Sequence, residues 1–173
     1  MATGDQMQSK SNSLGKYCGV FLLLLGASSS IAEDTAGPQQ QIEALFHSYF
    51  ELFNAGESMA IAKQIFATPV QFSIETGHDS WETEADIVRG FDESLNTLRA
   101  EGWAKSIIEE LSVCVLAENL ALVDLTYSRL RADGSTIPPR LRKGTYVVLR
   151  SSHTWRIIAD YGHDVEARVY CSD

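Results

Sequence analysis

Apolar side chains recur at helical spacing in the first half of the chain. From position 42 to 53 they follow intervals of three, four and seven residues, which is the pattern of one face of an amphipathic helix. They are Ile42, Leu45, Phe46, Tyr49, Leu52 and Phe53. Residues 54–56 end this helix, because Gly56 readily adopts the conformation that closes a helix. A second helix is predicted from about residue 57 to 66, and Pro69 stops it.

A third helix is predicted over residues 84–100. Thr83, followed three residues later by Asp86, resembles a capping box with aspartate in place of glutamate. The apolar face of this helix consists of Ile87, Val88, Phe91, Leu95 and Leu98. Before it, residues 70–74 are predicted to form a short strand and residues 76–80 a loop.

The second half of the chain is rich in β-branched and apolar residues. Strands are predicted near residues 105–116, 120–131, 142–150 and 154–161. Residues 132–135, with the sequence Ala-Asp-Gly-Ser, form a turn. The residue pair 138–139 is Pro-Pro, which cannot lie in a central strand. Helices followed by strands indicate an α+β fold.

The N-terminal segment has the pattern of a secretory signal. Two lysines precede an apolar run at 20–25, and small residues follow up to Ala32. Residues 17–32 are too few and too rich in serine for a membrane span of about 20 apolar residues. The sequence therefore predicts a signal peptide at 1–32, and export to the periplasm or the medium with no membrane span after cleavage. A linker at 33–41, a domain at 42–164 and a tail at 165–173 follow.

Charge and cysteine content narrow the possible functions. The 173 residues carry a net charge of -9, which makes nucleic acid a poor partner. Residues 129–173 hold 8 basic and 5 acidic side chains, which fits either a local anion site or a solvated hairpin. After cleavage, Cys114 and Cys171 could form a disulfide or remain free thiols. No zinc-type spacing, phosphate loop or nucleophile elbow is present, so neither a metal nor a cofactor is predicted.

Three segments resemble the nuclear transport factor 2-like (NTF2-like) superfamily, which includes ketosteroid isomerases, scytalone dehydratase and polyketide-cyclase-type proteins. They are residues 44–57 in the first helix, residues 66–69 at the exit of the second, and residues 146–158 in the last two strands. The resemblance covers about residues 40–164. It implies a cone, in which three N-terminal helices pack on a strongly bent antiparallel sheet. It implies no single function, because this fold hosts enzymes and non-enzymes.

The resemblance also tests for ketosteroid isomerase chemistry. Tyr49 matches the tyrosine that stabilises a developing oxyanion in those enzymes, although its place on the apolar face also suits a core tyrosine. The position of their general base is Ile74, with Glu75 beside it, and the position of their second aspartate is Val147. Two of the three catalytic groups are thus absent, so the chain is not predicted to be a ketosteroid isomerase.

Other polar residues could serve in the cavity. By the resemblance, even positions of the strand 120–130 face the cavity, which places Asp124 and Thr126 there, and the last strand turns Asp160 inward. Two carboxylates in one pocket with Tyr49 would raise one pKa and supply an acid or base. Alternatively, both aspartates pair with arginines or reach solvent. His163 follows the last strand, where it could line the rim or be exposed.

The predicted ligand-binding residues are Phe46, Phe72, Trp81, Thr126 and His163, and the candidate catalytic residues are Tyr49, Asp124 and Asp160. Tyr127, Tyr146 and Val148 are expected on an apolar outer face that forms a homodimer. Three functions remain open. The first is an exported domain that binds a small, largely apolar ligand in its cone. The second is an isomerase or dehydratase that uses Tyr49 with a pocket carboxylate. The third is a dimerising interaction domain with a filled cone.

Overall fold

The computed structural model describes residues 36–74 and 77–167. Three helices, α1 (Pro38–Ala55), α2 (Ser58–Gln64) and α3 (Glu84–Ala100), form one side of the domain. None of the helices in the described part of the chain is long and apolar enough to cross a membrane. The predicted signal peptide lies outside the described residues.

The helix ends follow the predicted capping chemistry. Gly56 adopts φ 77° and donates its N–H to the Phe53 carbonyl, while Glu57 N–H bonds the Leu52 carbonyl. This pair of bonds is a Schellman motif. The capping box of α3 is confirmed, since Thr83 Oγ1 accepts from Asp86 N–H and the Asp86 carboxylate accepts from Thr83 N–H. Helix α1 begins at Pro38, so residues 38–41 are helical rather than linker.

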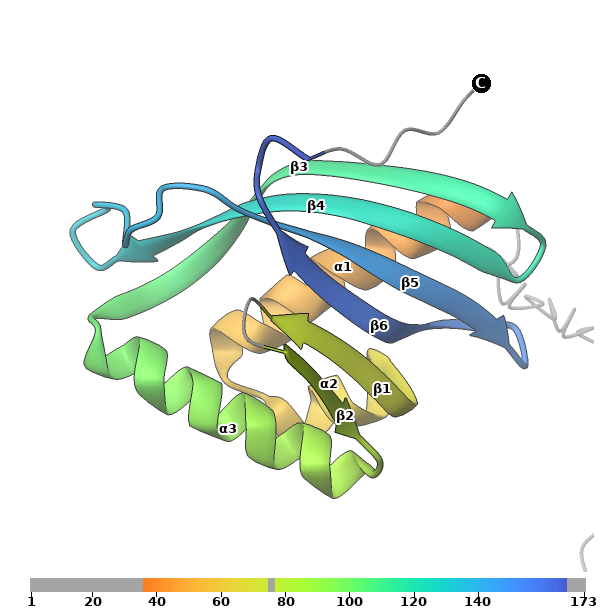
Figure 1. Ribbon diagram of the computed structural model, residues 1–173, viewed down its shortest axis with the longest axis horizontal. Coiled ribbons are helices and arrows are strands. Elements are labelled where there is room, and N and C mark those ends of the chain that lie inside the picture. The colour runs from red at the N-terminus through yellow and green to blue at the C-terminus, as the bar shows by residue number, and fades with distance from the viewer. Residues whose placement is uncertain (1–35, 75–76, 168–173) are drawn as a thin grey trace, which may run out of the picture. The chain divides into compact units, whose positions relative to one another are not determined.

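Six strands form one sheet: β1 (Phe66–Ile74), β2 (Gly77–Trp81), β3 (Trp103–Ala117), β4 (Leu120–Arg131), β5 (Arg142–Ser151) and β6 (Thr154–His163). Their order across the sheet is β2-β1-β6-β5-β4-β3. Strands β1 and β6 run parallel, and all other neighbours are antiparallel. The sheet is therefore mixed, and not wholly antiparallel as predicted. Figure 1 shows the long strands β3 to β6 curving over α1, with β1 and β2 at one edge.

Strand β2 corrects a second prediction, because residues 76–80 had been assigned to a loop and residues 77–81 form a strand. These polar residues pair with β1, with Ile74 opposite Gly77 and Val70 opposite Trp81. An edge strand tolerates polar residues on both faces. The segment is therefore extended because of its partner strand and not because of its own pattern.

The odd-numbered side chains of β4 face the helices, whereas the even-numbered ones had been predicted to face inward. The odd-numbered side chains Ala121, Val123 and Leu125 are fully buried in the core between the sheet and the helices. Asp124 and Thr126 therefore point to the other face. On β5, Tyr146 pairs in register with Val123 and lies in the same core. The inner face of β4 is apolar because it packs on the helices, and the prediction assigned this apolar face to the outside.

A bulge in β6 changes which of its side chains face inward. Ile157 is paired with Val148 and Ala159 with Val147, so the register shifts by one residue between them. Ile157 is consequently buried on the inner face, although regular alternation from the inward Asp160 would have placed Ile158 there. Beyond the bulge, Asp160 lies opposite Tyr146 and faces inward as predicted.

Candidate functional site

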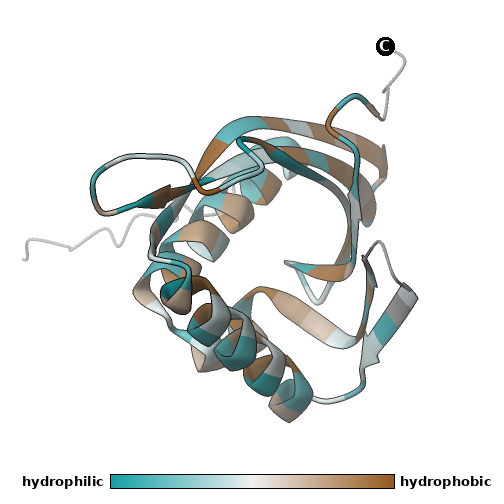
Figure 2. Ribbon diagram, turned by 60° about the vertical axis from the view of Figure 1, so that its left-hand side comes forward, coloured by the Kyte–Doolittle hydropathy of each residue, from teal (hydrophilic) through white to brown (hydrophobic). Residues whose placement is uncertain are grey.

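A cavity of about 370 Å³ lies between the helices and the inner face of the sheet. Figure 2 shows the curved sheet on one side of the domain and the helices on the other. Its lining comes from α1, α3 and all six strands. The aromatic lining residues are Tyr49, Phe50, Phe53, Phe72, Trp81, Phe91, Tyr127 and Tyr146. The polar ones are Ser73, Asp79, Ser94, Ser106, Arg129, Lys143 and Asp160, and Gly144 and Gly162 complete the wall. The volume lies within the range of small-molecule sites.

Tyr49 is at the centre of the aromatic wall. Its ring meets those of Phe50, Phe53, Phe66 and Phe91 edge to face, with centroids 5.5 to 6.2 Å apart. The contact with Phe53 arises because residues four apart on a helix lie on the same face. Edge-to-face packing fixes each ring in one orientation. The wall is thus a rigid apolar surface with a phenol at its centre.

Asp160 is the buried carboxylate of this cavity and lies beside Tyr146. The Tyr146 hydroxyl donates a hydrogen bond to it. Burial among apolar side chains disfavours the charged form and raises the pKa of Asp160 to about 7, although the bond from Tyr146 acts in the opposite direction. Asp160 can therefore hold or release a proton near neutral pH.

Gly144 makes room for this carboxylate. A Cβ at this position would lie 3.2 Å from Asp160 Oδ1 and 3.4 Å from a backbone oxygen on β6. Gly162 is its partner on β6, so two glycines face each other next to the carboxylate. A larger residue at position 144 would crowd the carboxyl group and its hydrogen bond.

Two phenols share the environment of Asp160. Burial, and then the nearby charge of Asp160, hold the pKa of Tyr49 well above its ordinary value. The same two causes raise the pKa of Tyr146. Both hydroxyls therefore keep their protons at neutral pH and can act as hydrogen-bond donors. With Asp160 protonated, the inner part of the cavity is uncharged and well suited to a carbonyl or hydroxyl group of a ligand.

Five of the eight predicted site residues lie on the inner face. Tyr49, Asp160, Phe72 and Trp81 line the cavity. Phe46 lies behind the wall, fully buried, with its ring centroid 5.0 Å from that of Tyr146. Tyr127, Tyr146 and Val148 also lie on the inner side and not on the predicted outer face.

Asp124, Thr126 and His163 lie elsewhere, which corrects their predicted place in the cavity. Asp124 Oδ2 is 2.9 Å from Lys143 Nζ on the opposite face, and both side chains are nearly buried. His163 Nε2 is 3.7 Å from Asp124 Oδ1 and 2.9 Å from Thr145 Oγ1. Asp124 is thus paired with a lysine, whereas the alternative prediction had named arginines or solvent.

Of the two positions that were compared with the catalytic aspartates of ketosteroid isomerases, the structure describes the side chain of Val147 but not that of Ile74. Val147 is half-buried on the opposite face, in register with Leu122, so a carboxylate at this position would not reach the cavity. The side chain of Ile74 and all of Glu75 lie outside what the structure describes. The inward carboxyl group is supplied instead by β6, through Asp160.

Residues missed by the sequence reasoning are Ser106, Tyr127, Arg129 and Tyr146 as lining groups. The correct phase of β4 would have placed Tyr127 and Arg129 on the inner face.

Cys114 is a disulfide-bonded residue, but Cys171 lies outside the described residues, so their pairing stays a prediction. In the described ranges no group of three His, Cys, Asp or Glu side chains is arranged to hold a metal ion.

The comparison with known proteins agrees with this architecture. Residues 39–165 match a protein family described as "NTF2-like protein (DUF6841)". No curated protein sequence matches the chain.

Three solved structures illustrate the structural likeness. An NTF2-like protein with a cystatin-like fold from Novosphingobium aromaticivorans is 16% identical, with a TM-score of 0.61 over 75% of this chain and 83% of that one. Aln2 from a Streptomyces species is 11% identical, with a TM-score of 0.60 over 76% and 94%. An NTF-2-like protein of unknown function from Shewanella oneidensis is 16% identical, with a TM-score of 0.58 over 74% and 100%. At these identities the likeness shows the fold alone.

Proposed function

We propose that this chain, which belongs to the NTF2-like protein family DUF6841, binds a small, largely apolar ligand in its cone. The observation that carries the proposal is the cavity of about 370 Å³, whose aromatic wall ends at Asp160 and Tyr146. Its volume supports a bound ligand over the alternative of a filled cone.

The lining suggests the chemistry of the ligand. Rings of Tyr49, Phe53, Phe91 and Trp81 favour a flat apolar body, since such rings stack or meet edge to face. The carboxyl group of Asp160 and the neighbouring phenols favour one carbonyl or hydroxyl group at the inner end. A ligand without such a group would leave these buried polar atoms poorly paired.

A second candidate is an enzyme of the isomerase or dehydratase kind. It is favoured by Asp160, whose pKa of about 7 suits proton transfer at neutral pH. In this reaction class Asp160 would move a proton, and the Tyr49 hydroxyl would stabilise the charge that forms on the substrate oxygen. The ligand-binding proposal does not depend on this step.

A thermal-shift screen with small aromatic ketones and phenols tests the binding proposal. Ser94 lies on the exposed face of α3 at the edge of the cavity, so Ser94→Trp should block entry and abolish every shift seen with wild type. Asp92→Trp is the matched control, because Asp92 is exposed on the same helix but lines another surface. If a ligand shifts Ser94→Trp as much as wild type, it binds outside the cone.

Turnover separates the two candidates. Asp160→Asn keeps the size of the side chain and an acceptor for Tyr146, but it cannot transfer a proton. For a pure binding protein this variant should keep affinity for the screened ligand. For the enzyme, conversion of the ligand should fall by at least about 100-fold.

We also propose a homodimer through the outer face of the sheet. With Tyr127, Tyr146 and Val148 turned inward, the apolar residues of this face are Leu120, Leu122, Val147 and Leu149, which lie in register on β4 and β5 and are only half-buried. An apolar surface of this kind favours a protein partner. Export, inferred from residues 1–32, remains part of the proposal.

A further inference from the structure

Arg129 is a cation of the cavity without a compensating carboxylate. It lies on the inner face of β4, and its buried Nε has no hydrogen-bond partner. Within residues 36–74 and 77–167 no acidic side chain comes within 4 Å of its guanidinium. The guanidinium carbon lies 5.6 Å from the centroid of the Tyr127 ring, and this cation–π contact partly stabilises the charge. A partly buried guanidinium normally has a paired anion, because removal from water is costly.

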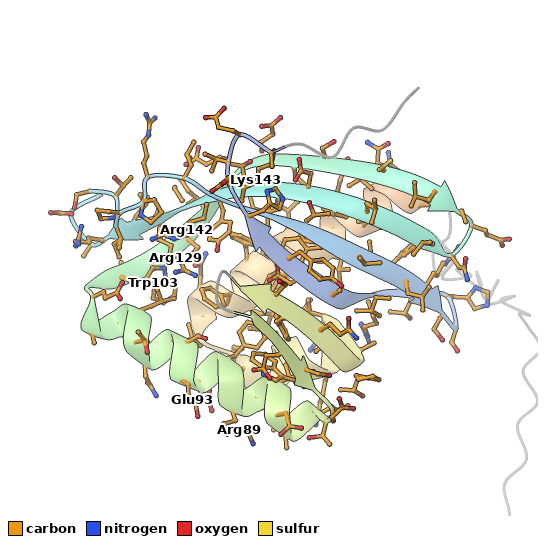
Figure 3. All side chains as sticks on the ribbon, viewed as in Figure 1. Arg89, Glu93, Trp103, Arg129, Arg142 and Lys143 are labelled. Atoms are coloured by element: carbon orange, nitrogen blue, oxygen red, sulfur yellow. The ribbon has the colours of Figure 1, made fainter. Side chains whose placement is uncertain are left out.

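A second guanidinium increases the positive potential at this end. Arg142 on β5 is the cross-strand neighbour of Tyr127, and Figure 3 shows it beside Arg129. Burial, and then the charge of Arg129, lower the pKa of Arg142. The guanidinium of Arg142 donates hydrogen bonds to the backbone oxygens of Ile137, Pro138 and Pro139. Three of its five N–H groups are thus occupied, and its main contribution to the site is positive charge.

A hydroxyl donor lies next to Arg129. Ser106 on β3 is paired in register with Arg129, is 3% exposed and lines the same cavity. Its Oγ accepts a hydrogen bond from Trp103 Nε1 at 3.1 Å, so its own proton remains available. The side-chain amide of Asn54 holds the backbone of Ser106 in place, with bonds of 2.7 and 2.9 Å.

The other charged groups of the cavity are accounted for. Lys143 Nζ is 2.9 Å from Asp124 on the opposite face. Asp79 is exposed at the edge and accepts from Trp81 Nε1 at 2.9 Å. Arg129, Asp79, Trp81 and Ser94 line both the cavity and the open groove beside α3, which places them at the mouth. The mouth thus carries Arg129, which has no ion-pair partner within 4 Å among the described residues, together with the exposed Asp79, and the groove beyond it carries Asp86, Glu93 and Glu101, while Asp160 is buried in the cavity.

We propose that Arg129 and Ser106 bind the carboxylate of a small apolar acid whose body lies along the aromatic wall. A guanidinium matches a carboxylate with two parallel hydrogen bonds, and the serine hydroxyl supplies a third. This inference rests on the proposed ligand binding and names the class of ligand. An apolar acid of this kind would place its carboxylate at the mouth and its other end near Asp160.

The test compares two probes that differ only in charge, 1-naphthylacetate and 1-naphthylacetamide, by calorimetry at pH 6. At this pH the acid probe is ionised, since carboxylic acids ordinarily titrate near pH 4. Wild type should bind the acid about 10- to 100-fold more tightly than the amide, the usual effect of a hydrogen bond to a charged group. Arg129→Gln should remove this preference, so that the two probes bind with similar affinity. Arg131→Gln is the matched control, because Arg131 lies on the same strand and bonds the Thr136 carbonyl instead.

Each outcome decides the inference. Loss of the preference in Arg129→Gln but not in Arg131→Gln supports it. Equal binding of acid and amide by wild type overturns the carboxylate subsite and leaves the binding function standing, whereas a preference that survives in Arg129→Gln also overturns it. If neither probe binds wild type, both proposals fail. Should Arg129→Gln not fold, Arg129→Lys keeps the charge without the planar fork, and its acid preference should fall severalfold; an unchanged preference contradicts the inference.

Discussion

The shifted pKa of Asp160 predicts that Asp160→Asn stabilises the protein at alkaline pH and not at acidic pH. Folding raises this pKa from the ordinary 3.8 to about 7. The folded protein therefore holds the proton more tightly than the unfolded chain does. The stability that this proton provides is complete below about pH 4 and is lost as the pH rises through about 7.

The size of the effect follows from the shift. A difference of about three pKa units corresponds to about 4 kcal/mol of unfolding free energy at pH 8. Because the carboxyl group opens onto the cavity, water moderates its cost, and we expect about 2–4 kcal/mol. Asparagine resembles the protonated carboxyl group in size and carries no charge. Asp160→Asn should therefore match wild type near pH 4 and exceed it by this amount at pH 8.

Guanidinium unfolding at the two pH values measures this difference. Groups that titrate in both proteins cancel when the variant is compared with wild type at one pH. Asp124→Asn is the matched control, and its effect should have the opposite sign. It leaves the nearly buried charge of Lys143 without its carboxylate, so it should destabilise the protein by about 3–5 kcal/mol at pH 8. A gain in Asp160→Asn that is equal at pH 4 and pH 8, or a loss at pH 8, would refute the assignment of Asp160 as a costly buried carboxylate.

Three further predictions concern the cavity, the outer face and the N-terminal segment. Tyr49→Phe should lower ligand affinity by about tenfold and change stability by at most about 0.5–1.5 kcal/mol in calorimetric titration and thermal melting, because it removes one hydrogen-bonding group; full affinity in this variant would remove Tyr49 from the site. Leu122→Glu should convert the proposed dimer to monomer in sedimentation, and a wild type that sediments as a monomer at every concentration would contradict the interface. Exported protein should begin near Glu33 by N-terminal sequencing and, unreduced, should show no alkylatable thiol at Cys114 or Cys171 by mass spectrometry; retention of residues 1–32 or two free thiols would count against these two expectations.

Local sequence chemistry was sufficient to predict most of the elements. The 3–4 spacing around Tyr49 and the Thr83–Asp86 capping box identified α1 and α3, since both signals lie within one or two helical turns. The four long strands were predicted within about three residues at each end. Strand β2 was missed because residues 77–81 carry no alternation, and their extended form depends on pairing with β1.

The site was harder to predict because its face assignments depend on distant contacts. Both faces of β4 carry polar side chains, so alternation alone did not show that α1 covers the side of Val123 and Leu125. The bulge in β6, which places both Ile157 and Asp160 inward, has no sequence signal of its own. Arg129 and Ser106 meet only after β3 and β4 have paired. The basic excess in residues 129–173 was the single hint of an anion site, and it did not identify the arginine.

The most direct test of the central claim is an NMR experiment that locates a bound probe. We predict intermolecular nuclear Overhauser effects from 1-naphthylacetamide to the ring protons of Tyr49 and Tyr146, which line the cavity. The exposed ring of Tyr161 provides an internal control and should show none. Effects to Tyr161 alone, or none to any cavity ring at a probe concentration that saturates a calorimetric titration, would contradict a ligand-binding cone.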